Sequence, residues 1–261
     1  SYYRAIQRVD WYVGHLLALL EEFGRARNTL VVFTADHGPS HILRGKTTPY
    51  ENGLRVPFIA RWPGTIPPGT RSEALVSFVD LAPTFMEVAG LRPPGYLPGY
   101  SLVPVFRGQP SERDCLYSAY NGHTTGEGSY WPTRTITDGR FKLIHNLNGD
   151  GTTRRIAQGY YNTHHAMARI LDRLPPDSTA RRVAERSMAP PEFELYDLEL
   201  DPGEIQNLAG QPDDHEIERD LRDRLWNWRT EVVRDPFCDP AYLAGFNDEM
   251  AKQVERMEAK R

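Results

Sequence analysis

The stretch Leu30-Val31-Val32-Phe33-Thr34-Ala35-Asp36-His37-Gly38 joins a short apolar run to a carboxylate and an imidazole. Four consecutive apolar residues ahead of a polar turn predict a buried strand of the kind found in α/β proteins. In such proteins, ligands bind beyond the carboxyl ends of the strands. We therefore expect Asp36 and His37 to stand at the edge of a ligand-binding site.

A second segment follows closely and reads Gly45-Lys46-Thr47-Thr48-Pro49-Tyr50-Glu51-Asn52-Gly53-Leu54-Arg55-Val56-Pro57. It places the ammonium group of Lys46 on a glycine-flanked loop, which suits the binding of an anion. Metal-ligating residue types beside an anion-binding lysine predict the hydrolysis of an anionic ester.

Each of these residues also has a plain structural interpretation. Asp36 could form a turn at the end of a strand, and Lys46 could be a solvated surface lysine, as most lysines are. Arg44 is an alternative to Lys46 if the register of the loop differs by two residues. We interpret Glu51 and Arg55 as structural, an ion pair or backbone clamp that shapes the loop.

Composition and charge are those of an ordinary globular chain of 261 residues, enough for one large domain or two small ones. Its residues are 39% hydrophobic and 25% charged. The net charge of -4 excludes a general electrostatic attraction to nucleic acid or acidic membranes. No apolar run approaches the roughly 20 residues that span a bilayer. Two cysteines make no disulfide framework, so the compartment stays undetermined.

The first part of the chain alternates helical and strand patterns. Apolar residues keep helical period over residues 2–23, and Asp80 is a suitable N-cap for a helix that runs through Ala89. Short apolar runs predict buried strands at residues 30–33, 57–61 and 74–77. This alternation predicts an α/β fold with a mainly parallel sheet covered on both faces.

Beyond the proline-rich stretch at residues 93–99 the pattern changes. Strands are predicted at residues 116–120, 134–137, 141–145 and 193–196, and Asp138-Gly139 is a strong hairpin signal. An amphipathic helix is predicted over residues 214–233, with five apolar residues on one face: Ile217, Leu221, Leu225, Trp228 and Val232. Residues 149–191 are predicted to form a long, partly helical insertion, and residues 248–261 a charged helix or arm. We expect one domain at residues 1–110 and a small antiparallel sheet with a covering helix at residues 111–261.

The order and spacing of the motifs carry a family resemblance. The two segments above are accompanied by Val79-Asp80-Leu81-Ala82-Pro83-Thr84, Leu195-Tyr196-Asp197 and Asp201-Pro202-Gly203-Glu204. Together with the helical pattern at residues 2–23, they resemble the C-terminal half of a sulfatase, in the alkaline-phosphatase-like superfamily. The resemblance implies the C-terminal part of that α/β domain, followed by the antiparallel subdomain.

The motif that holds the nucleophile of a sulfatase is missing. Sulfatases carry it near the N-terminus as Cys/Ser-x-Pro-Ser-Arg, and its first residue is oxidised to formylglycine. Neither Cys115 nor Cys238 stands in such a motif, nor does any serine. The N-terminal Asp-Asp metal pair of the family is missing too. We therefore expect a fragment that begins in mid-domain, with the formylglycine in the missing N-terminal half of the same protein.

The resemblance assigns roles to three residues. Asp36 and His37 would complete a divalent-metal site, and Lys46 would bind the sulfate and stabilise charge during catalysis. Calcium is the family's expected metal, but many sulfatases have asparagine where this chain has His37. Because imidazole suits zinc and its neighbours better than calcium, zinc and manganese remain open.

Other histidines have weaker claims to a role. His123 and Glu127 follow a predicted strand in a loop that could contact substrate, although a plain surface loop is an equal alternative. His145 ends an apolar strand and is expected to be structural. The pair His164-His165 lacks a second ligand cluster and is not expected to bind metal.

One subgroup of sulfatases resembles the chain further, on four stretches: Pro132-Thr133-Arg134, Phe141–Asn148, Glu204–Ala209 and Asp235-Pro236-Phe237-Cys238. These are similar to N-sulfoglucosamine sulfohydrolases, which act on the N-sulfate of glucosamine in heparan sulfate. Those enzymes tend to have asparagine and arginine at the positions of His37 and Lys46, so N-sulfate and O-sulfate both remain open. The implied substrate is a sulfated carbohydrate or another sulfate ester. The alternatives are a phosphodiesterase or phosphonate monoester hydrolase of the same superfamily, or a non-catalytic carbohydrate-facing or interaction module.

Overall fold

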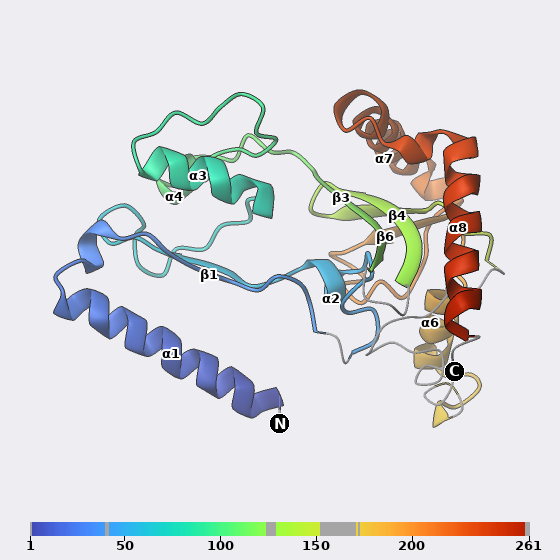
Figure 1. The fold of residues 1–261 in the computed structure, drawn as a ribbon, viewed down its shortest axis with the longest axis horizontal. Coiled ribbons are helices and arrows are strands. Elements are labelled where there is room, and N and C mark those ends of the chain that lie inside the picture. Colours follow the sequence, from blue (N-terminus) through green and yellow to red (C-terminus); the bar gives the residue numbers. More distant parts are fainter. Residues whose placement is uncertain (1, 40–41, 124–128, 152–170, 172, 259–261) are drawn as a thin grey trace. The chain divides into compact units, whose positions relative to one another are not determined.

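The computed structural model describes residues 2–39, 42–123, 129–151, 171 and 173–258. The chain forms two compact units, each built from two stretches of sequence (Figure 1). Ser1–Ala35 and Pro57–Asp114 make the first unit, and Asp36–Val56 and Cys115–Arg261 make the second. The segment with the predicted site residues therefore belongs to the second unit. The domain boundary near residue 110 stays a prediction.

The first unit holds two paired strands and several helices. β1 (Val31–Thr34) pairs with β2 (Phe58–Arg61), and the long helix α1 (Tyr2–Glu22) is followed by the turn η1 (Ala26–Asn28). Further along lie η2 (Phe78–Asp80), α3 (Leu81–Val88) and α4 (Val103–Phe106). The predicted helices at residues 2–23 and 80–89 are thus present. The carboxylate of Asp80 accepts the backbone N–H of Ser77 at 2.8 Å, so it closes the turn before α3.

The sheet of the first unit differs from the predicted one. β1 and β2 are antiparallel, with Val31 opposite Arg61, and no parallel pair occurs among the described residues. A parallel pair needs a crossover that packs back on the sheet, usually a helix. Here the segment between the two strands joins the second unit instead. Residues 74–77 form no strand, because an apolar run indicates burial but does not supply a hydrogen-bonded neighbour.

The second unit contains the predicted antiparallel sheet, and its four strands lie in the order β3-β4-β5-β6. Its strands are β3 (Leu116–His123), β4 (Ser129–Thr137), β5 (Phe141–Asn146) and β6 (Phe193–Asp197). The β4–β5 turn lies at Asp138-Gly139, where Gly139 has a φ of 100°. The carboxylate of Asp138 accepts the N–H groups of Arg140 and Phe141 at 2.9 and 2.7 Å, which fixes the hairpin.

The described residues of the second unit also form helices and helical turns. They are α2 (Glu51–Leu54), α6 (Thr179–Met188), η3 (Pro212–Asp214), α7 (His215–Asn227), the π-helical turn η4 (Trp228–Val232), η5 (Pro236–Cys238) and α8 (Pro240–Glu258). No helix within the described ranges is both long and apolar enough to cross a membrane.

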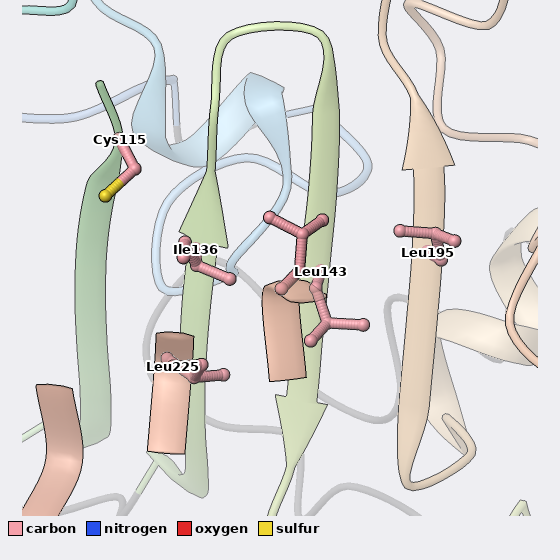
Figure 2. Packing of buried hydrophobic residues seen from close by; sticks show 6 residues of the cluster. Cys115, Ile136, Leu143, Leu195 and Leu225 are labelled. Atoms are coloured by element: carbon pink, nitrogen blue, oxygen red, sulfur yellow. The ribbon is translucent and has the colours of Figure 1, made fainter. Parts of the chain in front are cut away.

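One face of the sheet packs against α7, as predicted (Figure 2). The register places Ile136, Leu143 and Leu195 side by side on β4, β5 and β6. These three and Leu221 of α7 are 0% exposed, and Leu225 is 2% exposed. Burying each such side chain contributes roughly 1.5–3 kcal/mol before the entropy cost of folding. This cluster is the main core of the second unit.

The predicted helix face is wrong at its last residue. Val232 is 63% exposed, whereas Arg229 is 2% exposed. The π-helical turn explains the difference, because its wider turn rotates the following residues away from the 3.6-residue period.

The opposite face of the sheet carries the side chains that alternate with the core residues. Ile144 and Tyr196 point to this face, and both are 0% exposed. Tyr50, which is also 0% exposed, packs against them from the segment Asp36–Val56. The segment that carries the predicted site residues is therefore anchored on the antiparallel sheet.

Candidate functional site

Asp36 and His37 follow β1 directly, and their side chains face one another. The backbone N–H of His37 donates to Asp36 Oδ1 at 3.0 Å, and His37 Nε2 lies 3.1 Å from Asp36 Oδ2. His37 Nδ1 lies 2.8 Å from the carbonyl oxygen of Gly38. Because that carbonyl can only accept, Nδ1 carries a proton and Nε2 is directed at the carboxylate. A carboxylate oxygen facing an imidazole nitrogen is suited to share a proton or a metal ion.

Glycines allow the two predicted motif segments to approach at backbone distance. A Cβ on Gly38 would lie 1.7 Å from the carbonyl oxygen of Asn52. A Cβ on Gly45 would lie 1.9 Å from the carbonyl oxygen of Pro39. The N–H of Gly38 donates to the carbonyl of Gly53 at 3.0 Å, which ties the turn after β1 to α2. Any side chain at either glycine would separate the segments.

Lys46 is held at this junction by its backbone. Its N–H donates to the carbonyl of Pro39 at 3.1 Å, two residues beyond His37. Thr47, the next residue, has a φ of 68°, so the chain turns sharply after Lys46. Lys46 is half-buried, and its ammonium has no hydrogen bond or ion pair to any residue described. An ammonium in that position is available to an anionic ligand.

Arg44, the alternative cation of this loop, lies inside the protein. It is 4% exposed, and its guanidinium carbon lies 3.9 Å from the centre of the Tyr50 ring. Its Nε donates to Ser187 Oγ at 2.9 Å. Because the guanidinium is buried and held by these contacts, Lys46 is retained as the candidate for anion binding.

The two donors fit part of a metal site. Among the residues that the structure describes, no three His, Cys, Asp or Glu side chains are close enough together to hold a metal ion. Zinc takes four ligands and calcium about six to eight. The side chain of Asp36 is 84% exposed and that of His37 35%, so both can reach a metal whose other ligands come from elsewhere. A carboxylate with an imidazole suits zinc or manganese at least as well as calcium.

The remaining predicted residues fall only partly within the described ranges. His123 is the last residue of β3, and its backbone lies opposite Ser129 of β4. Glu127 and the pair His164-His165 lie outside the described residues. The proposed contact of His123 and Glu127 with substrate stays a prediction.

His145 has the structural environment expected of it. Its ring stacks on Phe193 with the centres 4.4 Å apart, and its Nδ1 lies 3.1 Å from Arg229 Nη1. Burial and the neighbouring charge of Arg229 lower the pKa of His145 to about 4. His145 is therefore neutral near pH 7, where it can accept from Arg229.

The predicted ion pair of Glu51 is present but long. Arg55 Nη1 lies 4.0 Å from Glu51 Oε2, and its side chain is 81% exposed, so this pair contributes little. The stronger partner is Lys142 of β5, whose Nζ lies 3.0 Å from Glu51 Oε1 and whose side chain is 1% exposed. Sequence reasoning missed Lys142. The signal was a charged residue inside the apolar strand Phe141–Asn146, on the face opposite the core.

Sequence reasoning also missed Glu194, which is likewise a charged residue inside an apolar strand. It stands between Phe193 and Leu195 and is 0% exposed. Its carboxylate accepts the hydroxyl of Tyr50 at 3.1 Å and the amide of Asn146 at 2.8 Å. Buried carboxylates persist when several donors satisfy them. Glu194 therefore ties the site-bearing segment to the sheet.

Comparison with known proteins gives consistent matches. The family model described as Sulfatase matches residues 1–91. An ulvan-active sulfatase of Formosa agariphila is 33% identical over 229 residues, which cover 87% of this chain and 42% of the relative. Human N-sulphoglucosamine sulphohydrolase is 31% identical over 264 residues, covering 91% of this chain and 49% of the relative. The chain thus spans less than half the length of these two relatives.

Solved structures agree in fold. A protein in complex with its substrate D-glucosamine-2-N,6-O-disulfate is 27% identical and aligns with a TM-score of 0.67, covering 90% of this chain and 41% of that one. A phosphonate monoester hydrolase of Agrobacterium radiobacter, 23% identical with a TM-score of 0.61, shares the fold over 88% of this chain and 40% of its own. Residues 1–91 therefore match the Sulfatase family model, and the chain is similar to sulfatases over most of its length.

Proposed function

We propose that the natural protein containing this chain is a metal-dependent sulfatase that hydrolyses a sulfate ester or sulfamate. The observation that carries the proposal is the hydrogen bond from Lys46 N–H to the Pro39 carbonyl, 3.1 Å long. This bond holds the backbone of Lys46 next to the turn that follows Asp36 and His37, which supports a shared role for the three residues. The similarity to sulfatases supports the same chemistry, which requires a metal ion and a formylglycine.

Each residue has a distinct task in this proposal. Asp36 and His37 supply a carboxylate and an imidazole to a metal, which would act as a Lewis acid toward the sulfate oxygens. Lys46 stabilises the negative charge that develops on those oxygens as the bond to sulfur breaks. The formylglycine nucleophile is expected in the N-terminal part of the protein. Calcium is the first candidate for the metal, and His37 is the reason to test zinc and manganese as well.

The proposed substrate class is a sulfated glycosaminoglycan sugar, with N-sulfoglucosamine as the specific candidate. Two similarities support it: the human sulphohydrolase named above, and the solved structure that holds a disulfated glucosamine. His123 and Glu127 are proposed to contact the sugar, because variable loops commonly select the substrate while the scaffold holds the metal.

The test is a direct comparison of kcat/KM in the natural protein. The substrates are N-sulfoglucosamine, glucosamine 6-O-sulfate and a phosphonate monoester. A preference for N-sulfoglucosamine supports the specific candidate. A preference for the O-sulfate retains the sulfatase proposal and rejects the N-sulfatase one. A preference for the phosphonate monoester rejects both, and loss of sugar turnover in Asp36→Ala confirms that the measured activity belongs to this site.

The N-terminal part of the same protein is also the proposed partner of α1. This helix has no buried residue, and three of its large side chains are strongly exposed: Tyr3 at 77%, Trp11 at 61% and Leu16 at 61%. Exposed apolar residues along one helix indicate a surface that is covered in the complete protein. The relatives are longer than this chain, which supports the proposal that an N-terminal part covers α1.

A further inference from the structure

Glu204 occupies an unusual position that the proposed function does not use. It ends the turn Asp201-Pro202-Gly203-Glu204 after β6, and its φ is 53°. Residues other than glycine rarely adopt this left-handed conformation, because it places Cβ close to the backbone. Glu204 is nevertheless 2% exposed, so its side chain is directed into the protein. Such a conformation persists where surrounding contacts fix it.

The contacts of Glu204 lie at both ends of the segment that carries Lys46. Before that segment, Arg44 Nη1 donates to the backbone carbonyl of Glu204. After it, the backbone N–H of Glu51 donates to Glu204 Oε2 at 2.7 Å. The one residue therefore fixes the chain on either side of Gly45–Tyr50.

Lys142 completes this arrangement from the sheet. Its Nζ lies 2.9 Å from Glu204 Oε1 and 3.0 Å from Glu51 Oε1. An ammonium between two carboxylates offsets their mutual repulsion, and the side chains of Lys142 and Glu204 are both buried. The carboxylate of Glu204 is thereby held in one orientation, with Oε2 directed at the N–H of Glu51.

The fixed segment in turn sets the site. Gly53, two residues beyond Glu51, accepts the N–H of Gly38 at 3.0 Å. Lys46 donates its N–H to Pro39 at 3.1 Å. A shift of the segment would therefore move the turn that bears Asp36 and His37 together with Lys46.

We propose that Glu204 is a positioning residue for the candidate active site, which it holds through Arg44 on one side of Lys46 and Glu51 on the other. The expected effect of this role on catalysis rests on the proposed function, whereas its expected effect on the position of the segment does not. Glu204 touches no reacting group. It acts by keeping Lys46 and the Asp36-His37 pair in one fixed arrangement, which catalysis requires.

The test compares Glu204→Gln with Glu204→Met in the natural protein. Glutamine keeps an oxygen that can accept the Glu51 N–H, whereas methionine has similar length and no such acceptor. Residue-resolved hydrogen exchange is measured at Gly38 and Lys46, and at Leu143 in the core as the reference for global unfolding. The kcat/KM for a sulfated substrate is measured on the same samples.

The matched control is Glu218→Met. Glu218 is 5% exposed, accepts the backbone N–H of Gly210 at 2.8 Å and pairs with Arg222, and no hydrogen bond or ion pair joins its side chain to the described residues of the segment Asp36–Val56. Its loss should therefore destabilise the second unit without a selective effect on the site.

In Glu204→Met, we expect protection at Gly38 and Lys46 to fall about tenfold or more relative to Leu143, because a buried N–H loses a charged acceptor. The kcat/KM should fall with it, and Glu204→Gln should restore both to within about threefold of wild type. Glu218→Met should change the exchange protection of Gly38, Lys46 and Leu143 by the same factor. If Glu204→Met does not fold, Glu204→Asp replaces it, since the shorter side chain draws the carboxylate back from the Glu51 N–H.

A parallel loss at all three amides in Glu204→Met, or no rescue by Glu204→Gln, would overturn the positioning role. A natural protein without sulfate turnover would reject the proposed function alone, because the exchange measurement still decides whether Glu204 positions the segment. If exchange protection falls selectively at Gly38 and Lys46 while kcat/KM stays unchanged, the expected effect of Glu204 on catalysis is rejected.

Discussion

Asp36 and Lys46 are proposed for one site, but their substitutions are expected to have different effects. Asp36→Ala would remove a proposed metal ligand, so both metal affinity and kcat/KM should fall, the latter by about two orders of magnitude or more. Lys46→Ala removes only the ammonium, so kcat/KM should fall while metal content stays constant. Metal analysis of the purified variants and steady-state kinetics separate the two. Unchanged metal content and rate in Asp36→Ala would mean that the metal site lies elsewhere.

His145 makes the stability of the protein depend on pH. Burial, together with the charge of Arg229, lowers its pKa to about 4, whereas the unfolded chain has the ordinary value of 6.5. Between these values the unfolded state binds more protons than the native state. Stability from this group is therefore complete above about pH 6.5 and is lost as the pH falls toward 4, by roughly 3 kcal/mol at most.

Urea unfolding from pH 7 to pH 4 measures this effect. The other charged groups that surround the imidazole also act on it: Arg134, Arg222, Asp235 and Glu192. The comparison is therefore made with His145→Gln, which keeps an acceptor for Arg229 and does not titrate. We expect the pH dependence of wild type to exceed that of His145→Gln. Equal slopes in the two proteins would contradict the assignment.

At the level of elements, the turn after β1 depends on close backbone contact. In Gly38→Ala, the new Cβ would meet the Asn52 carbonyl oxygen at 1.7 Å, so the two segments must separate. We expect kcat/KM to fall about 100-fold, as a displacement of about 1 Å at a catalytic group does. The free energy of unfolding should fall by only about 1–3 kcal/mol.

The control for this substitution is Gly245→Ala in α8. A Cβ there has no heavy atom within 4 Å, so alanine should leave activity unchanged and, as the better helix former, slightly increase stability. Equal activity in the Gly38 and Gly245 variants would show that the turn tolerates separation of the segments. Kinetics and urea unfolding of both variants supply the comparison.

The elements that the sequence predicted well are those with a strong local pattern. Strands β3 to β6, the Asp138-Gly139 hairpin and α7 each follow from periodicity and turn chemistry. The start of β4 was missed because Pro132 argues against a strand interior. The structure accommodates it at an irregularity, where the β3–β4 register shifts between Tyr120 and Gly122. That shift depends on the partner strand, which a local pattern does not contain.

The candidate site also combines residues that a local sequence pattern predicts with residues that depend on long-range contacts. Asp36, His37 and Lys46 could be chosen because a strand, glycines and a turn surround them in sequence. Lys142 and Glu204 could not, because they approach Glu51 only after the chain has folded. Their burial depends on pairing across more than 90 residues, and residue type alone favours a solvated position for both.

At the scale of the whole molecule, the boundary between the two units falls between β1 and the segment that carries the candidate site residues. β1 belongs to the first unit, whereas Asp36–Val56 packs on the antiparallel sheet through Tyr50 and Glu194. Folding of that sheet is therefore a condition for the arrangement of Lys46 and its neighbours. The sheet and α7 form one continuous core, so the second unit has its own source of stability.

The chain on its own should hydrolyse no sulfate ester, even where its second unit is folded. It contains no Cys/Ser-x-Pro-Ser-Arg motif, and no three potential metal-ligating side chains cluster among the described residues, so Asp36 and His37 are the two donors proposed. Two donors bind a divalent ion weakly, and without a nucleophile the ammonium of Lys46 has no transition state to stabilise. The measurement is turnover of an aryl sulfate by the purified 261-residue chain, with circular dichroism as the control for folding. Turnover that disappears in Asp36→Ala would show that these residues suffice for catalysis, and the need for an N-terminal half would then be withdrawn.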